Sequence, residues 1–198
     1  QKYPDVSVQL RVHSTRRTGW SVANGQIDLA IIGGQLPSDL EDLLEVIPYA
    51  TDELALVLPT KHPLANKREL MKEDLYKMNF VTLDSQSTTR KVVDKLLKDS
   101  GLDIQRLKIE MELNSLEAIK NAVQSGLGAS FLPVVSIERE LAGGSIHKPF
   151  VTDLEVKREL KLITNPSRYT SRASEAFKKY ILPQFASPES PLRQINLI

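Results

Sequence analysis

Three segments, in a fixed order along the chain, restrict what these 198 residues can fold into. They are GQIDLAIIGG at 25–34, LALVLPTKHPLA at 54–65 and NAVQSGLGASFLP at 121–133. The first is typical of a helix stop before a buried strand, and the second of a strand that ends at prolines. The third is typical of a helix, a glycine turn and another buried strand. None of them contains a nucleophile, a metal-ligand cluster or a phosphate loop, so the pattern predicts a binding protein of two α/β lobes rather than a catalyst.

Strand and helix patterns alternate along the first part of the chain. Apolar residues alternate with polar ones at 6–12, which predicts a strand with one solvated face. Residues 27–32 are almost all apolar, as in a parallel strand that helices cover on both faces. A helix at 15–24, stopped by Gly25, would join the two strands into one βαβ unit.

The same alternation continues in the rest of the chain. Further strands are predicted at 54–58, 80–83, 109–113, 129–132 and 160–163. Further helices are predicted at 88–99, 116–124 and 166–183, each with an apolar stripe at helical spacing. The last helix is expected to stop at Pro183, because proline disrupts a helix interior.

Composition and charge exclude several classes of function. Lys and Arg number 26 against 25 Asp and Glu, so the chain lacks the basic excess that binding to polyphosphates requires. No apolar run approaches the roughly 20 residues of a membrane-spanning helix, and no signal peptide opens the chain. The absence of cysteine excludes disulfides and thiolate chemistry, and it is compatible with a reducing cytoplasm. We therefore expect a cytoplasmic protein without membrane contact.

Few residues are candidates for a catalytic or metal-binding role. His13, His62 and His147 lack the spacing of metal ligands, so we expect no metal site, no cofactor and no catalytic residue. We interpret five acidic residues as a solvated surface rather than as paired catalytic acids; they are Glu41, Asp42, Glu45, Asp52 and Glu53. The turn at 125–128 matches neither a nucleophile elbow nor a dinucleotide fingerprint.

In wording, order and spacing the three segments resemble the effector-binding domain of LysR-type transcriptional regulators. The segments at 13–34, 83–97 and 110–133 further resemble the subgroup that controls carbon-dioxide fixation and inorganic-carbon uptake in cyanobacteria and plastids. This subgroup includes regulators of RuBisCO operons. The resemblance extends from residue 1 to about residue 183.

The resemblance implies an α/β fold of the type II periplasmic-binding-protein kind, with two Rossmann-like lobes joined by two crossover strands. Lobe I would comprise residues 1–60 and 166–183, lobe II residues 61–165, and residues 184–198 would be a tail. The first strand and helix of lobe I and the DNA-reading helix-turn-helix of the family are not in the chain. The family also implies a homodimer of this domain, a homotetramer of the full-length protein, and operator DNA bound only through the upstream helix-turn-helix. The cell compartment would be the cytoplasm or the plastid stroma.

A small anion in the cleft between the lobes is the expected effector. Ser87 and Thr88 begin a helix whose positive end would accept a carboxylate or phosphate, although Ser87 could equally be only an N-cap. Arg16 could clamp an oxyanion or be a solvated surface residue. The candidate effector-binding residues are Ser14, Thr15, Arg16, Gln86, Ser87, Thr88 and Asn114.

The subgroup suggests 2-oxoglutarate, 2-phosphoglycolate or ribulose 1,5-bisphosphate as the effector, with a reduced nicotinamide nucleotide as a further choice. Two other classes of function share the fold. A solute-binding receptor of a transport system would carry a secretory signal upstream. An enzyme would show convergent acids, bases or a cofactor lysine, and we find none of these in the sequence.

Overall fold

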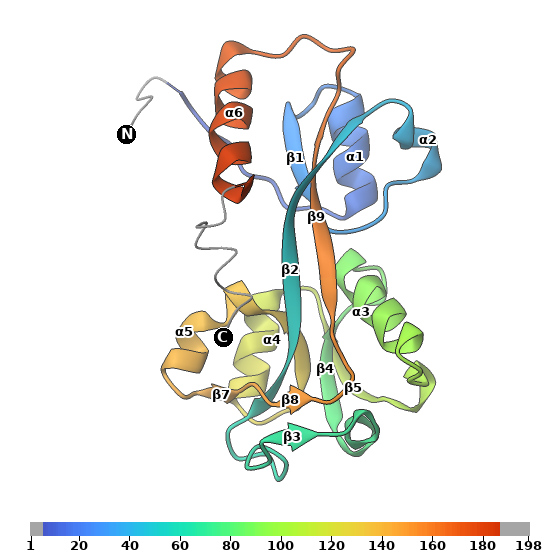
Figure 1. Cartoon of the computed structure of the whole chain (residues 1–198), viewed down its shortest axis with the longest axis vertical. Helices are drawn as coiled ribbons and strands as arrows, with labels where there is room; N and C mark the ends of the chain where they lie inside the picture. The colour runs from blue at the N-terminus through green and yellow to red at the C-terminus, as the bar shows by residue number, and fades with distance from the viewer. Residues whose placement is uncertain (1–5, 187–198) are drawn as a thin grey trace. The chain divides into compact units, whose positions relative to one another are not determined.

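The computed structural model describes residues 6–186, with only the backbone for 183–186. The chain divides into two compact units, Gln1–Ala50 with Glu159–Ile198, and Thr51–Arg158. We call these unit 1 and unit 2. Strands β2 (Glu45–Pro59) and β9 (Lys157–Thr164) both continue from one unit into the other (Figure 1). The lobes implied by the resemblance, with boundaries near residues 60 and 165, stay a prediction, and the expected tail lies largely outside the described residues.

Unit 1 contains the helices α1 (Thr15–Ala23), α2 (Ser38–Glu41) and α6 (Arg172–Ala186) and the strand β1 (Leu29–Ile32). β1 pairs antiparallel with β9, with Leu29 opposite Thr164. The buried core of this unit consists of Val22, Ala23, Ile32, Leu40, Leu44 and Ile163. Gly25 follows α1 with a φ of 71°, a left-handed conformation that glycine adopts without strain. The predicted helix and its glycine stop are therefore confirmed.

Two predictions for unit 1 are wrong. Residues 6–14 form neither strand nor helix, and Val8, Leu10 and Val12 are 72%, 88% and 84% exposed. The alternation of residue types provides an apolar face, but a strand also needs a neighbour to satisfy its backbone groups. The strand at 29–32 is paired antiparallel, and Ile31 is 45% exposed, so it is not a parallel strand buried on both faces.

The end of α6 also differs from the prediction. The helix continues through Pro183 to Ala186. Proline removes one backbone donor and usually kinks a helix, yet it does not always end one. Of the predicted apolar stripe, Ile181 is buried, whereas Phe177 and Tyr180 are 42% and 53% exposed.

Unit 2 is built on parallel strands. β4 (Asn79–Leu83) and β5 (Lys108–Leu113) pair in parallel, and Ala129 forms a parallel bridge with Phe80. β6 (Ser130–Pro133) follows and pairs antiparallel with β2. The helices are α3 (Thr88–Asp99), α4 (Leu116–Gln124) and the short α5 (Glu138–Ala142). The strands and the two long helices predicted for this region are confirmed.

Smaller elements complete unit 2. β7 (Ile146–His147) pairs antiparallel with β2, and β3 (Glu69–Leu70) pairs in parallel with β8 (Phe150–Val151). Three short 3-10 helices lie at Lys72–Lys77, Ile104–Arg106 and Val134–Ser136. Within unit 2, β2 and β9 are also joined through Val156, the residue before β9, whose carbonyl accepts a 2.8 Å hydrogen bond from the Leu54 N–H.

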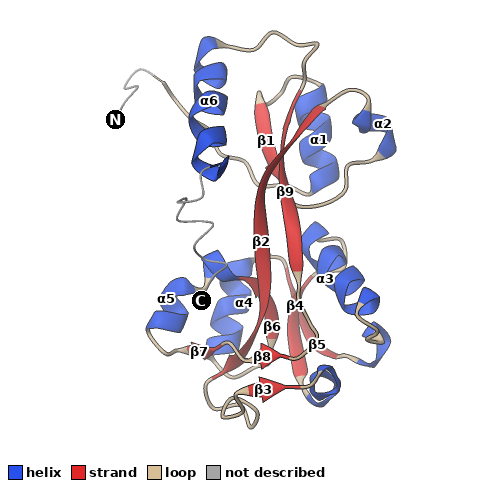
Figure 2. Ribbon diagram, viewed as in Figure 1, coloured by secondary structure: helices blue, strands red, loops and turns tan. Residues whose placement is uncertain are grey.

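The two long helices of unit 2 cover opposite faces of its strands (Figure 2). Phe80 packs in one apolar cluster with Val93 and Leu97 of α3. The next strand residue, Val81, packs in a second cluster with Ile119 of α4. Successive side chains of a strand point to opposite faces of the sheet, and so the neighbouring residues Phe80 and Val81 pack against different helices.

Candidate functional site

The carboxyl ends of β4 and β5 meet at one edge of unit 2. Leu83 and Leu113 are register partners, and the Asp84 N–H donates to the Leu113 carbonyl at 3.0 Å. Each strand is followed by a short turn and then by a helix, α3 after β4 and α4 after β5. The turns at 84–87 and 114–115 therefore lie side by side at the edge where open α/β sheets bind ligands. We call this the α3 edge.

The N-terminus of α3 favours an anion more than that of α4 does. Ser87 is the N-cap, and its hydroxyl accepts a long hydrogen bond of 3.5 Å from the Arg90 backbone N–H. The first turn of α3 contains no acidic residue, whereas α4 carries Glu117 in its first turn. The positive end of the α3 dipole is therefore not offset by a carboxylate of its own first turn, so it can attract a bound anion.

Four of the predicted binding residues lie along the α3 edge. Gln86 and Asn114 are exposed, and Ser87 and Thr88 are partly buried. The turn before α3 is ordered by Asp84, whose side chain accepts a 2.9 Å hydrogen bond from the Gln86 N–H.

The other three predicted residues belong to unit 1, at the N-terminus of α1. Ser14 is the N-cap of α1, but its side chain makes no capping hydrogen bond. Thr15 is buried and Arg16 is exposed. The Ser14 hydroxyl is therefore not used to cap its own helix, and the binding role of these residues stays a prediction.

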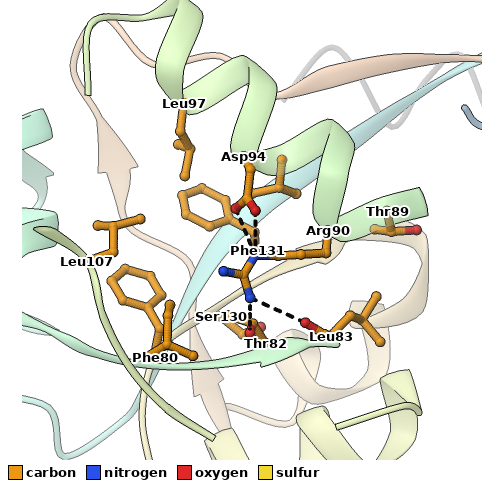
Figure 3. Close-up of a pocket in the computed structure, with 12 residues that line it drawn as sticks. Phe80, Thr82, Leu83, Thr89, Arg90, Asp94, Leu97, Leu107, Ser130 and Phe131 are labelled. Carbon is orange, nitrogen blue, oxygen red and sulfur yellow. Dashed lines mark hydrogen bonds and ion pairs between the residues drawn. The ribbon is translucent and has the colours of Figure 1, made fainter. Parts of the chain in front are cut away.

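Two arginines that were not predicted from the sequence, Arg90 (Figure 3) and Arg158, hold the α3 edge in place. Arg90 donates through Nε to both oxygens of Asp94 at 2.8 Å, and through Nη1 to the Leu83 carbonyl at 3.3 Å and to the Thr82 hydroxyl. This ties the first turn of α3 to the end of β4. The only local signal in the sequence was the spacing of four residues between Arg90 and Asp94.

Arg158 makes the second set of contacts. Its Nε and Nη2 donate to Oδ2 of Asp52 at 2.9 and 2.7 Å, and its Nη1 donates to the Thr89 hydroxyl at 2.8 Å. Both arginines thus have a carboxylate partner, and the Arg90 Nη1 also lies 3.5 Å from Glu112. An anion at this edge would therefore be held mainly by the hydroxyl groups of Ser87 and Thr88 and by backbone N–H groups, while the two arginines fix the position of the first turn of α3.

A pocket opens beside Arg90, between α3 and the strands (Figure 3). Its apolar side includes Phe80 and Phe131, whose rings are stacked with centroids 6.2 Å apart and planes within 2°. Its polar side includes Thr82, Thr89 and Arg90. The pocket has a volume of only about 30 Å³, room for about one water molecule, so it is a gap in the packing between α3 and the strands and is too small to hold a metabolite.

The interpretation of the acidic residues as a solvated surface is wrong for two of them, Asp52 and Glu53, whereas the Glu45 side chain is 46% exposed. Asp52 is only 7% exposed and pairs with Arg158, and Glu53 lies 3.0 Å from Lys148. Glu45 accepts hydrogen bonds from Lys178 at 2.6 Å and from Thr164 at 2.8 Å, and these bonds hold the pKa of Glu45 below its usual value. Asp52, Glu53 and Glu45 all lie on β2, whose first half, residues 45–51, was not predicted as a strand.

Other chemistry finds no support in the part of the chain that the structure describes. Within residues 6–186, no group of three or more His, Cys, Asp or Glu side chains could hold a metal ion. Over the same range, none of the helices is long and apolar enough to cross a membrane. His62 serves a local structural role, because its Nδ1 accepts a 3.2 Å hydrogen bond from the Leu64 N–H.

Residues 1–186 match the family described as the LysR substrate binding domain. The chain belongs to this family. It is 62% identical over 189 residues to a "Probable RuBisCO transcriptional regulator" of Trichormus variabilis, a match that covers 96% of the chain. It is 56% identical over 188 residues to a protein of the same name from Porphyra purpurea, over 95% of the chain. The chain spans only 56% and 59% of the lengths of these two relatives.

Solved structures of LysR regulators share the fold. The CcmR regulatory domain of Synechocystis PCC6803, in complex with 2-PG, superimposes with a TM-score of 0.81 at 24% identity over 94% of this chain and 87% of that one. The effector-binding domain of QuiR, in complex with shikimate, gives 0.77 at 22% identity, over 94% and 85% of the two chains. The predicted fold class, mixed α/β of the type II periplasmic-binding-protein kind, is confirmed. Because the relatives are regulators, the prediction that the chain is not an enzyme is also confirmed.

Proposed function

We propose that this chain is the effector-sensing part of a LysR-type regulator that controls carbon-fixation genes. The observation that carries this proposal is the 62% identity with a probable RuBisCO regulator along 96% of the chain. The complete protein would bind operator DNA through a helix-turn-helix upstream of the residues shown, and a metabolite would alter that binding. The metabolite must bind two states of the regulator with unequal affinity, since a ligand with equal affinity for both shifts nothing.

We further propose that the effector is a small organic anion held at the α3 edge. The acid-free first turn of α3, the hydroxyl groups of Ser87 and Thr88 and the neighbouring Asn114 support this placement. The complex of the similarly folded CcmR domain with 2-PG supports an anionic metabolite. Candidates are 2-phosphoglycolate, 2-oxoglutarate and ribulose 1,5-bisphosphate.

Thr88→Val is expected to weaken binding of the cognate metabolite about 5- to 150-fold. A hydrogen bond from a hydroxyl to a charged ligand is lost, which costs about 1 to 3 kcal/mol. Isothermal titration with each of the three metabolites measures the effect. Thr152→Val is the matched control, because Thr152 is hydrogen-bonded to Glu69, on the parallel pair of β3 and β8. Unchanged affinity in Thr88→Val would contradict the placement, and Arg16→Ala tests the contribution of unit 1 in the same titration.

We propose in addition that the domain pairs with a second copy through α1. Trp20 is 37% exposed on this helix, whereas Val22 and Ala23 are buried in the core of unit 1. A large exposed aromatic side chain is typical of an interface, and a two-fold interface contains each contact twice.

Trp20→Glu is therefore expected to convert the dimer largely to monomer without unfolding it. Sedimentation velocity measures the change in mass, and circular dichroism checks the fold. Tyr169→Glu is the control, since Tyr169 is 90% exposed in unit 1 and lies outside α1. A wild-type domain that remains monomeric at high concentration, or a Trp20→Glu dimer of unchanged stability, would refute the proposal.

A further inference from the structure

One side chain links the α3 edge to both strands that continue from unit 2 into unit 1. Arg158 lies on β9, its carboxylate partner Asp52 lies on β2, and its hydroxyl partner Thr89 lies in the first turn of α3. The guanidinium group thus bonds simultaneously to a helix end and to a strand, while its own backbone belongs to a second strand.

The position of this contact in the chain is informative. Unit 2 is Thr51–Arg158, so Arg158 is its last residue and Asp52 its second. The residues directly before Thr51 and after Arg158 belong to unit 1, still within β2 and β9. Asp52 and Arg158 are therefore each within two residues of the point where β2 or β9 enters unit 1.

The contact is also suited to transmit a small movement. The side chains of Arg158 and Asp52 are 14% and 7% exposed, so solvent screens the ion pair much less than a surface pair. A guanidinium group presents its donors in a rigid planar fork, which fixes the relative positions of the two acceptors. Asp52 and Thr89 are consequently held at a set spacing, and a shift of the α3 turn must change the contact with Arg158 or move the strands.

We propose that Arg158 is a positioning residue that couples ligand occupancy at the α3 edge to the unit 1 parts of β2 and β9. This inference rests on the proposed function, because it assumes that a metabolite binds at the first turn of α3. The ligand would draw the turn containing Thr88 and Thr89 toward itself. Arg158 would pass this movement to β2 and β9, and so to the connections through which a regulator could sense the ligand.

Hydrogen–deuterium exchange of this chain tests the coupling. In the wild type, saturating 2-phosphoglycolate, 2-oxoglutarate or ribulose 1,5-bisphosphate is expected to slow exchange in the first turn of α3 and in residues 45–50 and 159–164. Thr89→Val removes the hydroxyl acceptor but leaves the Arg158–Asp52 pair. In Thr89→Val, the ligand should still slow exchange in α3 but should no longer slow it in residues 45–50 and 159–164. Thr89→Ser, which keeps a hydroxyl group, should restore the slowing in these two strand segments. A Thr89→Val protein with full protection of both strand segments would overturn the coupling.

A comparison without ligand separates this inference from the proposed function. Thr89→Val should speed exchange of the amides around Asp52 and Arg158 several-fold, and the control Thr152→Val should not. Should none of the three metabolites protect the α3 turn, the proposed effector site fails, and the ligand-free rates still decide the coupling. Equal rates in Thr89→Val and in the wild type would overturn it.

Discussion

Gly128→Ala is expected to destabilise unit 2 by about 3 kcal/mol, because the added methyl group has no space. A Cβ atom at this position would lie 2.7 Å from the Asn79 carbonyl oxygen and 3.2 Å from its carbon. This carbonyl cannot easily move, since it accepts a 2.8 Å hydrogen bond from the Ala129 N–H beside β4. Urea unfolding followed by circular dichroism measures the loss.

Gly126→Ala, two residues earlier in the same turn, is the matched control. Gly126 has a φ of 87°, and a Cβ atom there would meet nothing within 4 Å. The substitution carries only the cost of a left-handed backbone, about 1 to 2 kcal/mol. The two glycines of this turn are thus needed for different reasons, one for its dihedral angle and one for close approach of two chain segments. A larger loss in Gly126→Ala than in Gly128→Ala would disprove this explanation.

The sequence predicted best where the signals are local. The helices Thr88–Asp99 and Leu116–Gln124 have the predicted bounds, since each begins after a serine N-cap and carries an apolar stripe. The prediction of a strand at residues 6–12 was wrong, because an alternating pattern indicates which face could be buried but not which strand would pair with it. The first half of β2 was missed because its apolar residues, such as Val46, Ile47 and Tyr49, follow no period of two and are interrupted by Pro48.

The same distinction explains the candidate site. Ser87 and Thr88 could be found from the sequence, because capping preference depends on a few neighbouring residues. Arg158 and Asp52 could not, because they are separated by 106 positions and meet only when β2 and β9 fold together. An ion pair between distant positions produces no recognisable pattern in a single sequence. The residues that position the α3 edge could therefore be identified only from the structure.

Residues 1–198 alone are expected to bind operator DNA at least about a hundredfold more weakly than the longer regulator that we propose. Typical dissociation constants are about 10⁻⁸ to 10⁻¹¹ M for specific binding and about 10⁻⁴ to 10⁻⁶ M for non-specific binding. The net charge is only +1, and basic groups such as Arg90, Arg158 and Lys178 are already paired with carboxylates. Because acidic side chains nearly equal the basic ones in number, the chain offers little net positive charge to neutralise phosphates, on which non-specific affinity and its salt dependence rest. Fluorescence anisotropy with labelled operator at two salt concentrations, with the longer protein as positive control, measures the difference. Tight, salt-resistant binding by residues 1–198 would show that this domain itself reads DNA and would overturn the division of roles.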